Sequence, residues 1–128
     1  MIEKGIVGKG TVKVTDNNTA ESMVSGTLPV FATPAMILLI EKTAFESLVP
    51  YLQEGESTVG TLLNIKHTAP SAVGSEITCR TELIEVDRSR FVFDVKVCDR
   101  AGEVGLGIHE RFLVNNEKFM ARARSKLE

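Results

Sequence analysis

The stretch VFATPAMILLIEKTAFESLV at residues 30–49 decides the fold, because it has the apolar content of a central helix. Thr33 is a suitable N-cap, and Pro34 is tolerated as the first helical residue because its missing N–H would be unpaired anyway. Pro50 and the EGES that follows end the helix. The first turns, AMILLI, are apolar all round, and this predicts a helix enclosed by the rest of the chain.

Strand-like segments lie on both sides of this helix in the sequence. Residues 6–15 precede it, and four segments follow it, at residues 57–69, 76–87, 89–100 and 102–114. The turns VDRSR and DRAGE join neighbours as antiparallel hairpins. A short helix over about residues 115–126 closes the chain. One strand, one helix and a meander of antiparallel strands predict an α+β domain whose curved sheet wraps around the helix.

The two-residue alternation assigns side chains to the faces of these strands. The residues that share a face, strand by strand, are Val12 and Val14; Leu63, Ile65 and His67; Ile77, Cys79, Thr81 and Leu83; Phe91, Phe93, Val95 and Val97; and Val104, Leu106, Ile108 and Phe112.

Length and composition limit the classes of function. The chain has 128 residues, 43% of them hydrophobic and 25% charged, which is typical of one globular domain covering residues 1–128. A net charge of −2 gives no reason to expect nucleic acid as a partner. We expect no membrane partner, because no segment reaches the ~18 consecutive apolar residues of a span.

Cellular context and assembly also follow as expectations. The N-terminus MIEKGIVGKG lacks the long apolar run of a signal peptide, and Cys79 and Cys98 have no metal-ligand spacing. We therefore expect reduced thiols in a cytoplasmic protein. A single sheet leaves an edge strand and apolar surface uncovered, so we expect a homodimer, or a higher oligomer built from it.

Glu41 is the polar residue that the helix does not explain. Helical geometry places it on one face with Ile37, Leu38, Ala44 and Phe45. A carboxylate buried there is costly unless it is paired, hydrogen-bonded or protonated. Glu41 is therefore either solvated at a helix edge or a subunit boundary, or part of a polar site.

His67 is a second polar residue on an apolar face, beside Leu63 and Ile65. Alone, it would be read as a satisfied core histidine. With Glu41, and with Thr33 at the helix mouth, it completes the groups that acyl transfer needs: a nucleophile or water-holder, a base, and an orienting or proton-shuttling group. These three residues are the candidate catalytic site.

The runs VFATPAMILLIEKT, YLQEGESTVGTLLNIKHTAP, GIHERFLVN and EKF resemble the hotdog-fold thioesterases, and among them the fluoroacetyl-coenzyme A thioesterase group. The resemblance covers roughly residues 28–125. Its most specific part is the spacing of Thr33, Glu41 and His67, which members of the group share. It implies a hotdog fold and hydrolysis of a small acyl-coenzyme A by these residues, with no metal and no cofactor beyond the coenzyme A of the substrate.

The resemblance also implies roles for Gly60 and Arg111. Gly60, in TVGT, would offer its backbone near the thioester carbonyl, although a strand glycine also suits a simple bulge. Arg111, in HER, would lie near the active site or the coenzyme A, although a surface cation on a strand explains it equally well. His109 shares the face of Arg111 and is assigned no catalytic role.

The segment AESMVSGTLPVFA departs from the pattern of the group. Val24 and Thr27 stand where the group would place phenylalanines as a lid over the acyl chain, and Phe31 is the only aromatic residue nearby. Phe31 and Val24 are the expected contacts to the acyl group. The resemblance therefore implies thioester hydrolysis without implying selectivity for fluoroacetyl.

Two other functions fit the same residues. The chain could be a non-catalytic acyl-coenzyme A binding or scaffold protein on this fold, with Glu41 and His67 paired as a structural contact. A hydratase acting on enoyl-coenzyme A is weaker, because hotdog hydratases would be expected to hold Asp and His together in a different motif.

Overall fold

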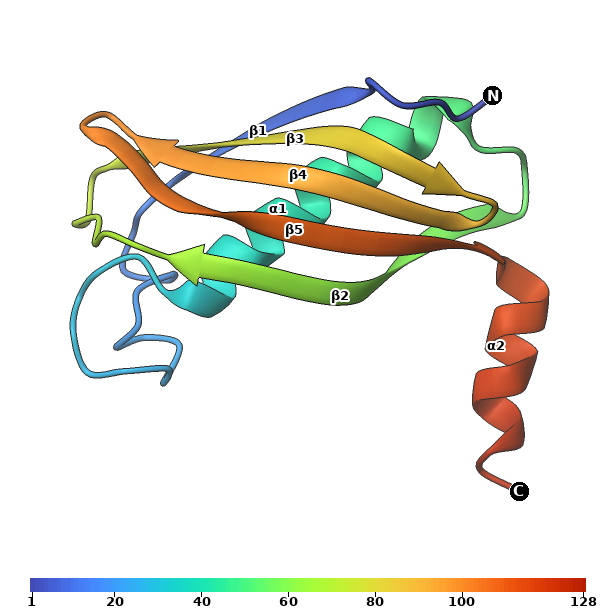
Figure 1. Cartoon of the computed structure of the whole chain (residues 1–128). Helices are drawn as coiled ribbons and strands as arrows, with labels where there is room; N and C mark the ends of the chain where they lie inside the picture. The colour runs from blue at the N-terminus through green and yellow to red at the C-terminus, as the bar shows by residue number, and fades with distance from the viewer.

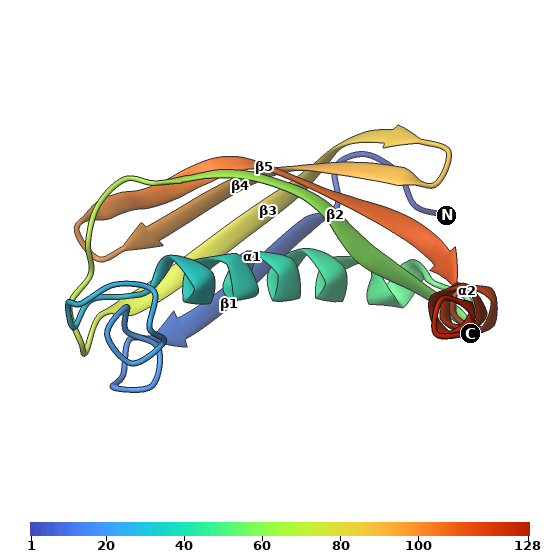
Figure 2. The ribbon, with the colours of Figure 1, turned by 90° about the horizontal axis from the view of Figure 1, so that it is seen from below.

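One long helix lies across the concave face of a curved antiparallel sheet in the computed structural model, which describes residues 1–128 (Figures 1 and 2). The elements in chain order are β1 (Val7–Lys13), α1 (Thr33–Leu48), the 3₁₀ helix η1 (Val49–Tyr51), β2 (Glu56–His67), β3 (Glu76–Asp87), β4 (Arg90–Asp99), β5 (Gly102–Asn115) and α2 (Asn116–Ser125). The α+β architecture with a wrapped helix is confirmed.

The strand order differs from the predicted meander. The sheet has five strands in the order β1-β3-β4-β5-β2, all antiparallel. The short hairpins predicted between β3 and β4 and between β4 and β5 are confirmed. β2 instead pairs with β5 at one edge, and β1 pairs with β3 at the other. The eight-residue connection 68–75 lets the chain cross from one edge to the other, so sequence neighbours are not sheet neighbours here.

The core lies between α1 and the concave face of β3 and β4. Both strands show the predicted alternation, and the predicted inward residues of each are fully or almost fully buried. From α1, Met36, Ile40 and Leu48 are completely buried against them. Burying one such side chain contributes about 1.5–3 kcal/mol. At the other edge, a Cβ added at Gly10 would lie only 2.5 Å from Thr43 Oγ1, so the helix approaches β1 closely because Gly10 has no side chain.

The run AMILLI predicts a helix that is enclosed on every side. This prediction is wrong, because one face of the helix is open. Leu38 is 64% exposed and Phe45 is 40% exposed. Both belong to the face that also carries Glu41. The sheet covers the other side of α1 and reaches Glu41 only at its margin, so Leu38 and Phe45 stay uncovered in the single chain.

A bulge in β5 overturns the face predicted for that strand. Val97 pairs with Gly105 but Cys98 pairs with Glu103, so Val104 is an extra residue opposite β4. Val104 is buried, whereas Phe112, predicted on the same face, is 43% exposed. The inward face after the bulge carries His109 and Arg111, opposite Phe93 and Phe91. A surface position for Arg111 is therefore wrong: it is 6% exposed.

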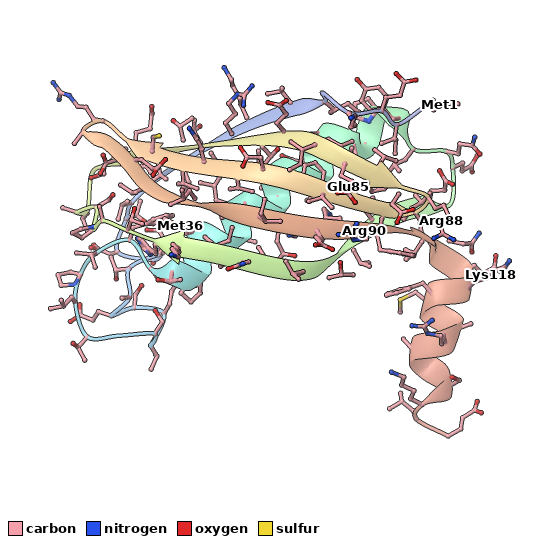
Figure 3. All side chains as sticks on the ribbon, in the orientation of Figure 1. Met1, Met36, Glu85, Arg88, Arg90 and Lys118 are labelled. Atoms are coloured by element: carbon pink, nitrogen blue, oxygen red, sulfur yellow. The ribbon has the colours of Figure 1, made fainter.

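The outer surface carries ordinary ion pairs and an outlying helix. Arg90 contacts Glu85 at 2.7 Å and Glu110 at 2.9 Å on the convex face, where Figure 3 labels Arg90 and Glu85. The predicted C-terminal helix is present as α2, which leaves the body of the molecule at the end of β5. At its N-cap, Asn115 accepts a hydrogen bond from the Lys118 N–H. Cys79 and Cys98 are free thiols. None of the helices has the length and apolar content needed to cross a bilayer.

Candidate active site

Thr33 and His67 meet at the N-terminal mouth of α1. Thr33 is the first residue of the helix and not its N-cap, which is Ala32, and no side chain caps this end. The hydroxyl of Thr33 is therefore free to make another contact, and its Oγ1 lies 2.8 Å from His67 Nδ1. The two residues come from the start of α1 and the end of β2, 34 positions apart in the sequence.

The surroundings of this pair favour a neutral imidazole. Burial lowers the pKa of His67, and a hydrogen bond with the backbone of Ala69 partly opposes that effect. The ring of Phe31 stands edge-on to the imidazole, with 6.4 Å between ring centroids. A pocket of about 320 Å³ opens beside them, lined by residues that include Phe31, Thr33, His67 and Ser25. A neutral imidazole can accept a proton from the Thr33 hydroxyl or from a water molecule.

Glu41 packs against Gly60 at a second place along the helix. A Cβ built on Gly60 would collide with Glu41 Oε2, and it would lie 3.3 Å from His109 Cε1 and 3.4 Å from Arg111 Nη1. Only glycine leaves room for the carboxylate here. Gly60 also adjoins a register shift in β2, between Gly60 and Leu62. Both interpretations of this glycine, close approach and bulge, are therefore met at one residue.

Arg111 provides the charge beside Glu41. Its Nη1 lies 3.5 Å from Glu41 Oε2, and the guanidinium stands over the ring of Phe45, 5.9 Å from the centroid. Arg111 Nε donates to Thr58 Oγ1 at 2.9 Å, and Nη2 donates to the Thr58 carbonyl at 2.8 Å. The side chain of Glu41 is 39% exposed, so its charge is paired on one side and open on the other.

The single chain therefore holds two clusters and not one. Thr33 meets His67, and Glu41 meets Gly60 and Arg111. Glu41 comes eight residues after Thr33 in α1, so the clusters are separated by about 12 Å along the helix axis. The convergence of all three candidate residues in one pocket, expected from the sequence, does not occur within one chain.

Two further residues have surroundings that the sequence does not predict. Val24 is 88% exposed and does not line the pocket, although its neighbour Ser25 does. His109, which was given no role, is completely buried and contacts Arg111, with His109 Nε2 3.2 Å from Nη1. No sequence pattern points to Thr58, which binds Arg111. One signal for His109 and Arg111 is present in GLGIHER, where two glycines lie on the same face of the strand as these residues. The other face carries Leu106 and Ile108 and is equally apolar, so the alternation does not show which face is buried.

Gly60→Ala tests whether the position of the Glu41 carboxylate matters. The added Cβ must displace the carboxylate, so we expect kcat for the reaction proposed below to fall about tenfold or more, since small misplacements of reacting groups are costly. Gly10→Ala is the matched control, because it crowds Thr43 on another part of the same helix. Steady-state kinetics and thermal unfolding should show that both variants lose stability while only Gly60→Ala loses activity. Equal activity in the two variants would contradict this role for Gly60.

Comparison with known proteins identifies the family of the chain. Residues 14–117 match the family model described as fluoroacetyl-CoA-specific thioesterase. A fluoroacetyl-CoA thioesterase of Streptantibioticus cattleyicolor is 38% identical over 97 residues, which are 76% of this chain and 70% of that protein.

Solved structures share the overall fold. A variant of the fluoroacetyl-CoA-specific enzyme, in complex with acetyl-CoA, superposes with a TM-score of 0.93 at 29% identity, covering 99% of this chain and 100% of that one. A hot-dog-like protein from Thermanaerovibrio acidaminovorans superposes with a TM-score of 0.91 at 24% identity, covering 99% and 94% of the two chains, which supports the fold alone. The sheet wrapped around α1 is thus a hotdog fold, and the chain belongs to the fluoroacetyl-CoA-specific thioesterase family.

Proposed function

We propose that residues 1–128 form a single hotdog domain that hydrolyses the thioester bond of a short acyl-coenzyme A, yielding the acid and free coenzyme A. Membership of a thioesterase family supports the reaction class. The observation that carries the proposal is the 2.8 Å contact between Thr33 Oγ1 and His67 Nδ1 beside a pocket of about 320 Å³. Fluoroacetyl selectivity is not part of the proposal, because Val24 is exposed and Thr27 has no aromatic ring.

Each candidate residue has its own role in the proposed reaction. Either the Thr33 hydroxyl attacks the thioester carbon and gives its proton to His67, or a water molecule attacks and gives its proton to Glu41, from which His67 receives it. The first turn of α1 offers backbone N–H groups without acceptors in the helix, and its positive end favours the oxyanion. The C–S bond then breaks, the electron pair stays on sulfur, and His67 returns the proton to the thiolate. An acyl-Thr33, if formed, is hydrolysed by the same steps with water.

A homodimer supplies what one chain does not. β2 is a free edge strand of 12 residues, and exposed apolar side chains lie along it and on the open face of α1. The set is Leu38, Phe45, Leu62 and Leu63. A long uncovered edge with apolar neighbours favours pairing with a second copy.

The symmetry of such a dimer has a direct consequence for the site. Two β2 strands related by a two-fold axis within a continuous sheet run antiparallel. The half of β2 that carries Gly60 in one protomer then approaches the half that carries the partner's His67. Each Glu41 cluster is thereby brought toward the partner's Thr33 and His67 cluster. We propose that each catalytic site uses Glu41 from one protomer and Thr33 with His67 from the other.

Thiol release tests the proposed function. The wild-type protein is assayed with a panel of acyl-coenzyme A esters of increasing chain length, with mass-spectrometric identification of the acid. We expect hydrolysis of short esters and a steep loss of kcat/KM as the chain outgrows the pocket. Absence of thiol release from every ester would refute the proposal.

The alternative is a protein that binds acyl-coenzyme A without turnover. The ion pair between Glu41 and Arg111 favours it, because such a pair can be purely structural. Titration calorimetry that shows binding of short acyl-coenzyme A, with no thiol released in the same sample, would favour this alternative.

The free thiols Cys79 and Cys98 support a reducing compartment, and we propose that the protein is cytoplasmic.

A further inference from the structure

His109 is completely enclosed, and its two ring nitrogens have different partners. The ring stacks against Phe93, with 6.1 Å between centroids and 27° between planes. Nδ1 lies 2.9 Å from the Leu62 carbonyl oxygen. A carbonyl oxygen only accepts hydrogen bonds, so Nδ1 carries the proton.

The other nitrogen must then be an acceptor. His109 Nε2 lies 3.2 Å from Arg111 Nη1, and a guanidinium only donates. These two partners are satisfied together by one form of the ring, the neutral imidazole with its proton on Nδ1. Each partner sits on a different strand, Leu62 on β2 and Arg111 on β5, so the ring also ties the two strands together at the bulge of β2.

Arg111 is consequently held mainly by neutral groups. Thr58 accepts hydrogen bonds from Nε and Nη2 of Arg111. Nη1 contacts His109 Nε2, and the same nitrogen also faces Glu41 Oε2 at 3.5 Å. The guanidinium thus has a defined position that does not depend on the carboxylate. A cation fixed in this way fixes in turn the place of the Glu41 charge, because the carboxylate lies between Arg111 and the α-carbon of Gly60.

We propose that His109 is a positioning residue: its neutral imidazole, with the proton committed to Leu62, holds the Arg111 guanidinium where it orients Glu41. This role rests on the thioesterase function proposed above for its effect on catalysis, while the arrangement of His109 and Arg111 can be tested without it. Protonation of His109 would turn its acceptor into a donor facing a cation, so acid breaks the contact with Arg111.

Burial and the charged groups around His109 determine the direction in which its pKa is shifted. Burial lowers the pKa of His109 most; the hydrogen bond with the Leu62 backbone raises it; Arg111 lowers it, and Glu41 and Glu110 raise it. The charged neighbours come from β5 (Arg111 and Glu110) and α1 (Glu41), whereas β2 and β4 contribute the Leu62 carbonyl and the Phe93 ring. The lowered pKa keeps the ring neutral at neutral pH and places the loss of the contact on the acid side.

Three variants separate the positioning role from packing. His109→Phe keeps a ring and removes both polar contacts. His109→Gln places an amide oxygen near the position of Nε2, where it can accept from Arg111 but cannot be protonated. Val95→Ala removes buried volume from β4 and none of these polar contacts, so it is the control for stability.

Kinetics provide the first readout. We expect kcat of His109→Phe to fall by about 10- to 100-fold with KM changed little, since the substrate still binds but Glu41 is misplaced. His109→Gln should recover to within about fivefold of the wild type, and Val95→Ala should keep its kcat at temperatures where it is folded. A folded His109→Phe with the wild-type kcat, or a His109→Gln as impaired as His109→Phe, would overturn the proposal.

Nitrogen-15 NMR provides a readout that needs no activity. We expect the Nδ1-protonated tautomer for His109, and separate Arg111 guanidinium N–H resonances in the wild type and in His109→Gln. These resonances should average together in His109→Phe, and in the wild type when the pH is lowered until the ¹⁵N shifts of His109 report its protonation, but not in His109→Gln. If the wild type hydrolyses no thioester, the proposed function fails and this pattern alone decides the role of His109. Arg111 resonances that are alike in all three proteins would refute it.

Discussion

Glu41→Gln is expected to lower kcat for thioester hydrolysis by about 10²-fold or more while leaving the fold intact. Glutamine has nearly the same shape as glutamate, so it fits between Gly60 and Arg111, but it carries no charge and cannot act as a base. Thr33→Ala and His67→Ala should show losses of the same order, because they remove the two atoms in contact at 2.8 Å. The measurement is single-substrate kinetics of thiol release with the best ester from the panel.

Glu46→Gln is the matched control for this series. It makes the same chemical change five residues further along α1, where the side chain is exposed. We expect it to keep the wild-type rate, because surface substitutions away from special contacts are usually close to neutral. Retention of more than about a tenth of the wild-type rate by each of the three site variants would show that these residues are not the catalytic group.

Mixing two inactive proteins is expected to restore activity. If each site takes Glu41 from one protomer and Thr33 with His67 from the other, a mixed dimer of Thr33→Ala and Glu41→Gln contains one site with both defects and one site with none. Random pairing of equal amounts makes about half of the dimers mixed, so about one quarter of the wild-type activity should return. The proteins are co-expressed or refolded together and assayed as the unfractionated mixture. The mixed dimer, isolated with two different affinity tags, should then show about half of the wild-type activity per dimer.

A second mixture serves as its control. Thr33 and His67 contact each other within one chain, so the mixed dimer of Thr33→Ala and His67→Ala has a damaged pair in both sites. It should stay inactive under the same conditions. Recovery in neither mixture, with mixed dimers present by mass, would refute the shared site. It would leave Glu41 and the Thr33–His67 pair to act about 12 Å apart along a single helix.

Much of the fold could be predicted because its signals are local. The helix of residues 33–48 follows from an apolar run bounded by two prolines, and β3 and β4 follow from clean two-residue alternation. Thr33, Glu41 and His67 were selected as polar residues in apolar patterns and as members of a family spacing. Such patterns report which residues share a face of one element, since the geometry of a helix or strand is the same in every protein.

The faces of β5 show where local reasoning ends. One extra residue at Val104 reverses the direction of every side chain after it, because the period of a strand is two. Both faces of GEVGLGIHERFLV carry apolar residues, so the two-residue alternation alone does not distinguish this register from the other. The strand pattern therefore leaves the surface alternative open for Arg111 and gives His109 no role, although both residues are buried beside Glu41.

The helices and strands, the α+β class and the three polar residues of the proposed chemistry can be predicted from local patterns in the sequence. The order β1-β3-β4-β5-β2, the inward direction of His109 and Arg111, and the separation of the candidate residues into two clusters depend on tertiary contacts. The physical reason is that strand pairing, bulges and the approach of α1 to Gly60 are set by contacts between segments far apart in the chain. Those contacts exist only once the sheet has closed around the helix.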